Sequence, residues 1–180
     1  MTRYEEIFAR HARMIHTRVD TRLSENDQLI LCGVGLPGEF AETVAEVVGS
    51  KEHLLETGDW LWYNHLLTMR IGFDFLQLTN LAVGSSKLDR TLQHNESMLV
   101  SFMMIGGISD IIKKVAVTKR KEFDEATKRV LASHIAASMV QPLGLFYADI
   151  DSTEARLDKV ADILLANIEK LEERSNEKYT

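Results

Sequence analysis

The feature that most constrains the fold is the scarcity of residues that break helices. The chain has 180 residues but only two prolines and ten glycines. Apolar side chains recur every three or four positions over long stretches, as at Ile7, Met14 and Val19 within residues 4–23, which is the spacing of an amphipathic helix. The alternation typical of strands is absent from the sequence. The sequence therefore predicts an all-α protein, a helical bundle.

Glycines, prolines and capping residues divide this chain into helices. We expect the helices to cover residues 4–23, 37–48, 51–71, 73–83, 88–118, 122–148 and 153–174. Pro37 is expected at the first position of its helix, where its missing N–H does no harm. Gly49 and Ser50 are expected to form a turn and an N-cap, and Pro142 to kink or end its helix. The other expected stops and caps are Ser24, Gly72, Gly84 and Ser152.

Length, charge and hydropathy restrict the class of protein. A chain of 180 residues suits one domain, here residues 1–180, with a core large enough to need no disulfide. The one cysteine, Cys32, lies in an apolar run and is expected in that core. A net charge of −6 argues against a nucleic-acid binder. With no signal-like start and no run of about 18 apolar residues, we expect a cytoplasmic protein without membrane contact.

Two short acidic pairs lie on consecutive expected helices. Glu39 and Glu42 share one helical face, as do Glu56 and Asp59, because residues three apart are neighbours on a helix. If the two helices pack antiparallel, four carboxylates meet, and their repulsion favours a divalent cation such as Mg²⁺ or Mn²⁺. Acidic residues number 27 of 180, so pairs at this spacing occur about once per chain by chance. The spacing alone is weak evidence for a metal site.

The residues around the acidic pairs make the pattern specific. The strings GLPGEFAE and LLETGDWLWY, within residues 35–63, resemble the signature of the MazG-like nucleotide pyrophosphohydrolases, the all-α superfamily that includes dimeric dUTPases and dCTP pyrophosphatases. That signature is GL-x-GE-x-x-E on one helix, followed by E-x-x-D running into GD-x-LWY on the next. The string NIEKLEER at residues 167–174 is similar to the closing N-x-x-KL-x-x-R helix of the family.

The resemblance implies a fold, a reaction and a set of site residues. The expected fold is the helical bundle of the all-α NTP pyrophosphohydrolases, and the expected reaction is Mg²⁺-dependent hydrolysis of a nucleoside triphosphate to monophosphate and pyrophosphate. The expected partners are the nucleotide substrate and a second copy of the chain in a homodimer. The expected catalytic and metal-binding residues are Glu39, Glu42, Glu56 and Asp59, and the expected substrate-binding residues are Trp62, Tyr63, Asn167, Lys170 and Arg174.

About 70 residues separate the LWY helix from the closing helix. This spacing is similar to the duplicated arrangement of dimeric dUTPases, with a metal-site half at 1–84 and a degenerate second repeat plus closing helix at 85–174. Ser109 and Asp110 stand near the acidic positions of that repeat and lysines follow them, so we expect no second metal site there.

Several alternatives remain open at this stage. The enzyme is either a general (d)NTP pyrophosphohydrolase or a base-restricted dUTPase or dCTPase; a non-catalytic nucleotide-binding or regulatory bundle is the rival from another class. A di-iron bundle is disfavoured because no histidine follows a glutamate by three residues. Lys170 and Arg174 contact phosphates or pair with glutamates on their own helix. Trp60 is expected in the core, His11 in a structural or exposed position, and Asn64 and His65 either at the base or on the helix surface.

Overall fold

The computed structural model describes residues 1–19, 22–85, 94–119, 121–147 and 149–177. Within these ranges all regular secondary structure is helical and no strand is found, which confirms the predicted all-α class. None of the described helices is long and apolar enough to cross a membrane. The helices are α1 (Arg3–Arg18), α2 (Glu25–Ala45), α3 (Lys51–Arg70), α4 (Phe75–Ser85), α5 (His94–Ile112), a π-helical turn η1 (Lys113–Lys119), α6 (Glu125–Gly144) and α7 (Thr153–Glu177).

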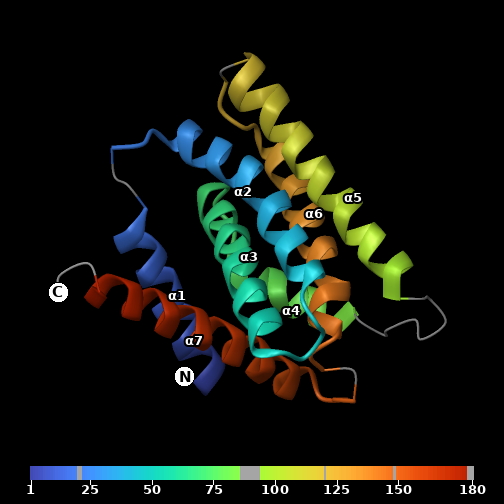
Figure 1. Ribbon diagram of the computed structural model, residues 1–180. Helices are drawn as coiled ribbons and strands as arrows, with labels where there is room; N and C mark the ends of the chain where they lie inside the picture. Colours follow the sequence, from blue (N-terminus) through green and yellow to red (C-terminus); the bar gives the residue numbers. More distant parts are fainter. Residues whose placement is uncertain (20–21, 86–93, 120, 148, 178–180) are drawn as a thin grey trace.

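The helices pack in pairs around the α2–α3 hairpin. Figure 1 shows α2 and α3 side by side in the centre, with α5 and α6 against one side and α1 crossing α7 on the other. Both ends of the described chain lie on the α1–α7 side. The first and last helices are therefore neighbours in space, although the rest of the chain separates them in sequence.

One hydrophobic cluster runs through the bundle from α1 to α7. Trp60 and Cys32 are both fully buried in it, as predicted, and burial raises the pKa of the Cys32 thiol to about 12, so this cysteine is a core residue and not a nucleophile. The apolar side chains of α5 divide between two environments. Met98 and Ile105 face the core, whereas Leu99, Phe102 and Met103 are exposed.

The prediction that a helix begins at Pro37 is wrong, because α2 starts at Glu25 and continues through Pro37 to Ala45. A proline inside a helix cannot donate to the carbonyl four residues earlier, here that of Gly33. The Ser109 hydroxyl of α5 donates to this carbonyl over 2.8 Å. A contact from the neighbouring helix therefore replaces the missing backbone hydrogen bond, and such a contact cannot be read from the local sequence.

The local start and stop signals predicted the start of α1, both ends of α3 and the start of α7 to within one residue. The Ser24 side chain accepts from the backbone N–H of Asp27 and Ser50 accepts from that of His53, and both cap their helices as expected. Gly49 has a φ of +83° in the turn between α2 and α3, a conformation that glycine adopts without strain.

Other predicted boundaries differ from the structure by two residues or more. The first helix ends at Arg18 instead of 23, Gly84 lies inside α4 instead of after it, and α6 begins at Glu125. The helix α6 ends at Gly144, two residues beyond Pro142. The helix α2 ends at Ala45 instead of 48, α4 begins at Phe75 instead of 73, and α7 continues to Glu177 instead of 174. The stretch predicted as one helix up to residue 118 is divided into α5, which ends at Ile112, and the π-helical η1, which ends at Lys119. The predicted stretch 88–93 lies outside the described residues.

Candidate metal and substrate site

The α2–α3 hairpin brings three of the four predicted carboxylates together. One side-chain oxygen from each of Glu39, Glu56 and Asp59 can be chosen so that the three atoms lie within 4.8 Å of one another. All three side chains are partly buried. Glu42 lies one turn beyond Glu39 on α2, is exposed, and is outside this group. The hairpin therefore presents a carboxylate triad, with Glu42 at its edge.

Burial and like charges act together on Glu39. Desolvation raises the pKa of the Glu39 carboxyl to about 7, and the charges of Asp59, Glu42 and Glu56 add to this effect, while Lys170 opposes it. A raised carboxyl pKa means that the ionised form lacks sufficient compensation by positive charge. When all three carboxyls are ionised, the Lys170 ammonium offsets one of their charges and leaves two, which is the charge that one divalent cation carries.

The closing helix α7 supplies the cation and the amide that meet the triad. The Lys170 ammonium donates to Asp59 Oδ2 over 2.6 Å and lies 3.6 Å from Glu56 Oε1, and its side chain is only 13% exposed. Asn167 is fully buried and its amide nitrogen donates to Asp59 Oδ1 over 2.6 Å. The expected alternative of a pair with glutamates on its own helix differs from the structure, in which Lys170 pairs with Asp59 and Glu56 of α3. The lysine is held inside the acidic site.

Two glycines allow these close contacts. A Cβ at Gly58 would lie 2.8 Å from the Cβ of Asn167, so a larger residue would push α7 away from α3. A Cβ at Gly35 would clash with the ring of Tyr63, so the glycine leaves room for that ring to lie against α2. The glycines of the GL and GD strings therefore fix how near the neighbouring elements come to the carboxylates.

An open pocket of about 280 Å³ adjoins the triad. Its acidic wall is formed by Glu39 and Asp59. The indole N–H of Trp62 is buried without a hydrogen-bond partner among the described residues, and an unsatisfied buried donor is costly unless a ligand accepts from it. The other residues that line the pocket are Arg18, Tyr63, Leu171 and Arg174.

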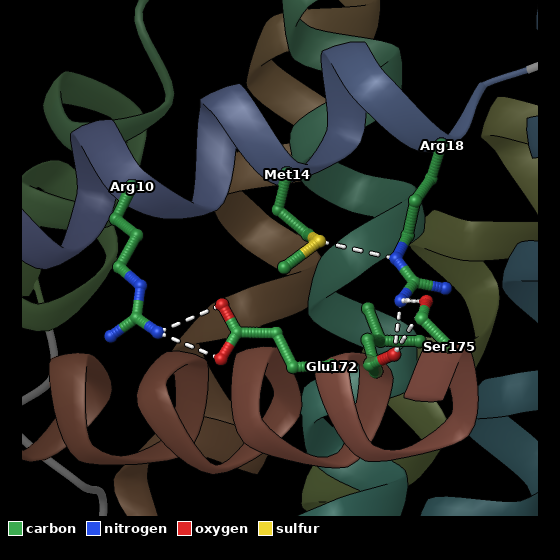
Figure 2. A network of polar contacts seen from close by, with 6 residues as sticks. Arg10, Met14, Arg18, Glu172 and Ser175 are labelled. Atoms are coloured by element: carbon green, nitrogen blue, oxygen red, sulfur yellow. Dashed lines mark hydrogen bonds and ion pairs between the residues drawn. The ribbon is translucent and has the colours of Figure 1, made fainter. Parts of the chain in front are cut away.

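Arg18 is a pocket residue that the sequence analysis missed. It lies in the last turn of α1, and its guanidinium donates to the Leu171 carbonyl and to Ser175 Oγ on α7 and to Met14 Sδ (Figure 2). Figure 2 also shows Arg10, two turns earlier on α1, paired with Glu172. No local motif marks Arg18, because it reaches the pocket only through the packing of α1 on α7.

Two buried histidines stand behind Asn167. His11 Nε2 lies 3.3 Å from Asn167 Oδ1, and His11 Nδ1 lies 2.8 Å from His65 Nδ1. Burial lowers the pKa of His11 to about 4 and that of His65 well below its ordinary value, with the neighbouring His11 adding to the second effect. Both rings are therefore neutral near pH 7. The structural role expected for His11 is confirmed, while Asn64 and His65 are buried and do not lie on the helix surface.

The structure thus brings most of the predicted site residues together. Glu39, Asp59, Trp62, Tyr63 and Arg174 line the pocket. Glu56, Asn167 and Lys170 contact or adjoin Asp59 without lining it. The arrangement combines hard oxygen donors, suited to Mg²⁺ or Mn²⁺, with aromatic faces and two guanidinium groups. It can hold a ligand that carries both a planar group and anionic groups.

Comparison with protein-family models, with curated proteins and with solved structures finds no match for this chain.

Proposed function

We propose that this protein is a Mg²⁺-dependent nucleoside triphosphate pyrophosphohydrolase of the MazG-like type, which releases a monophosphate and pyrophosphate in the cytoplasm. The observation that carries the proposal is the meeting of Glu39 with Glu56 and Asp59 across the α2–α3 hairpin, beside a pocket with aromatic and cationic walls. The sequence strings that resemble the family are the segments that build this arrangement.

The residues present fit a hard divalent cation. Three carboxylate oxygens within 4.8 Å of one another need only small side-chain adjustments to share one ion. Burial, and after it the like charges of Asp59, Glu42 and Glu56, raise the pKa of Glu39, and a bound cation would oppose both effects by stabilising the ionised carboxylate. When bound, Mg²⁺ would supply charge neutralisation for the triphosphate and a lower pKa for an attacking water. Mn²⁺ suits the same donors.

The remaining pocket residues suit the rest of the substrate. The rings of Trp62 and Tyr63 are 5.0 Å apart at 80°, and each ring offers an apolar surface for a base. Arg18 and Arg174 would donate to phosphate oxygens, for which the planar guanidinium is well shaped. Glu39 and Glu42 are the two candidates for the base that removes a proton from water. Asn167 and Lys170 would hold Asp59 in place.

The direct test measures the products. The wild-type protein with Mg²⁺ should release pyrophosphate, and not orthophosphate, from the four dNTPs and dUTP. Glu42→Gln and Asp59→Asn should each lose this activity while keeping the helical circular dichroism signal. Glu52→Gln is the matched control, because Glu52 is an exposed residue of α3 outside the triad. Unchanged turnover in both site variants would refute the assignment.

The same assay separates the alternatives. Activity confined to dUTP or to dCTP would identify a base-restricted enzyme, whereas similar rates on all substrates would identify a general house-cleaning enzyme. Nucleotide binding without release of either phosphate product would favour a non-catalytic regulator. The presence of the triad beside the pocket supports an enzyme, since a non-catalytic relative would be freer to lose these carboxylates.

We also propose that the protein is a homodimer. Leu99, Phe102 and Met103 follow helical spacing on α5 and are 58%, 51% and 62% exposed. Neighbouring α2 exposes Val34 and Val44. Large exposed apolar side chains gathered on one region are typical of a contact surface.

A further inference from the structure

We propose that His11, His65 and Asn167 form a buried positioning chain that orients Asp59 towards the bound cation. The inference goes beyond the triad itself and rests on the proposed role of Asp59 as a cation ligand. It assigns a role to His11 and His65, neither of which lines the pocket beside the triad. His11 lies on α1, and neither histidine belongs to the strings that resemble the MazG-like family.

The direction of every hydrogen bond in the chain follows from Asp59. Its carboxylate only accepts, so the amide nitrogen of Asn167 faces it and the amide oxygen faces His11. That oxygen also only accepts, so His11 carries its proton on Nε2. In a neutral ring His11 Nδ1 is then an acceptor, and the proton of the 2.8 Å contact between the rings sits on His65 Nδ1.

All three hydrogen bonds therefore point the same way. His65 donates to His11, His11 to Asn167 and Asn167 to Asp59 Oδ1, while Lys170 donates to Oδ2. Aligned hydrogen bonds polarise one another in a medium of low dielectric constant. With both oxygens held, the Asp59 carboxylate has one preferred orientation beside Glu39 and Glu56, with which it would share the cation.

Burial and helix packing hold the chain rigid. His11 and Asn167 are fully buried and His65 is 4% exposed, so each would lose a partner at a high cost if it rotated. The His65 ring stacks on Phe75 with centroids 4.3 Å apart. On α1, His11 lies between two arginines that contact α7. Arg10 precedes it directly, and Arg18 follows two turns later (Figure 2).

Two substitutions at His11 separate positioning from simple packing. A glutamine places its amide nitrogen close to where histidine Nε2 lies, and therefore keeps the donor to Asn167. An asparagine places its amide nitrogen near the position of Nδ1, and therefore keeps a polar group towards His65 but loses the donor to Asn167. Both replace the ring with a smaller amide, so both should lower the stability measured by urea unfolding to a similar degree.

The readout is Mn²⁺ affinity, measured by calorimetry without nucleotide. We expect His11→Gln to bind Mn²⁺ within about threefold of the wild type, and His11→Asn to bind it about 10- to 100-fold more weakly, the usual cost of losing a residue that orients a metal ligand. Equal Mn²⁺ affinities for the two variants would overturn the inference and leave the histidines with a packing role only.

A second measurement needs no metal. Nitrogen-15 NMR of the free protein should show His11 in the Nε2–H form and His65 in the Nδ1–H form at neutral pH. The opposite tautomer at either ring would overturn the proposed direction of the chain. If the wild-type protein bound no Mn²⁺ at all, the cation site of the proposed function would fail, whereas normal Mn²⁺ binding with wrong tautomers would refute the positioning chain alone.

Discussion

Replacing Glu39 with glutamine should stabilise the protein without metal and remove its stabilisation by Mg²⁺. The carboxyl of Glu39 has a pKa raised from 4.5 to about 7 by desolvation and by the nearby charges of Asp59, Glu42 and Glu56. The folded protein therefore keeps a proton that the unfolded chain loses. Between these two pH values the free energy of unfolding falls as pH rises, because the unfolded state binds fewer protons.

The size of the effect follows from the pKa. A rise in the pKa of Glu39 from 4.5 to about 7 corresponds to roughly 3 kcal/mol, because each pKa unit is worth about 1.36 kcal/mol. Glu39 is only partly buried, so solvent screening reduces this figure to about 1 kcal/mol. The amide of glutamine is neutral at every pH and resembles the protonated acid. The variant should therefore be about 1 kcal/mol more stable than the wild type at pH 8, a rise in Tm of about 2–4 °C, and equally stable near pH 4.5.

With Mg²⁺ present, the wild type should become more stable than Glu39→Gln. A cation at ten times its Kd adds about 1.4 kcal/mol to the stability of a protein that binds it. The wild type should gain this amount at pH 8, whereas Glu39→Gln lacks one of the three ligands and should gain much less. Thermal unfolding followed by circular dichroism measures the stability of both proteins in four conditions, at pH 4.5 and at pH 8, each with EDTA or with Mg²⁺.

Glu42→Gln is the control on the same helix. Glu42 is exposed and lies outside the triad, so its replacement should change stability without Mg²⁺ by less than Glu39→Gln does. The reasoning would be wrong if Glu39→Gln lowered stability at pH 8 in EDTA, or if Mg²⁺ stabilised it as much as the wild type.

Three further outcomes are expected. Arg18→Met should raise the KM for a dNTP about tenfold. Arg10→Met, which removes an exposed contact between the same two helices, should leave KM unchanged and cost under about 1 kcal/mol of stability. Equal KM values for the two variants would show that Arg18 does not contact substrate. Gly58→Ala should destabilise the fold by about 1–3 kcal/mol because its Cβ would meet that of Asn167 at 2.8 Å, and wild-type urea unfolding in this variant would contradict the tight α3–α7 contact. Phe102→Glu should convert the proposed dimer to a monomer in analytical ultracentrifugation, with Val130→Glu on α6 as an exposed apolar control; a monomeric wild type would remove the basis of this prediction.

Sequence reasoning succeeded where the signal is local. Ser24, Gly49 and Ser50 act on the backbone within a few residues, and the structure places caps and a turn at them. The acidic pairs were also readable, because spacing along a helix fixes which residues share a face. Pro37 misled the analysis because its effect depends on a hydroxyl of α5, which compensates for the hydrogen bond that the proline cannot make.

By itself the sequence determined that the chain is helical, where several of its helices begin, and that α2 and α3 carry acidic faces. Tertiary structure decided what those faces meet. Asn167 and Lys170 reach Asp59 from 108 and 111 residues away, and Arg18 and His11 join them only because α1 packs on α7. Helical periodicity is a property of each segment alone, whereas the partners of a buried carboxylate depend on which helix crosses it, and no local pattern encodes that crossing.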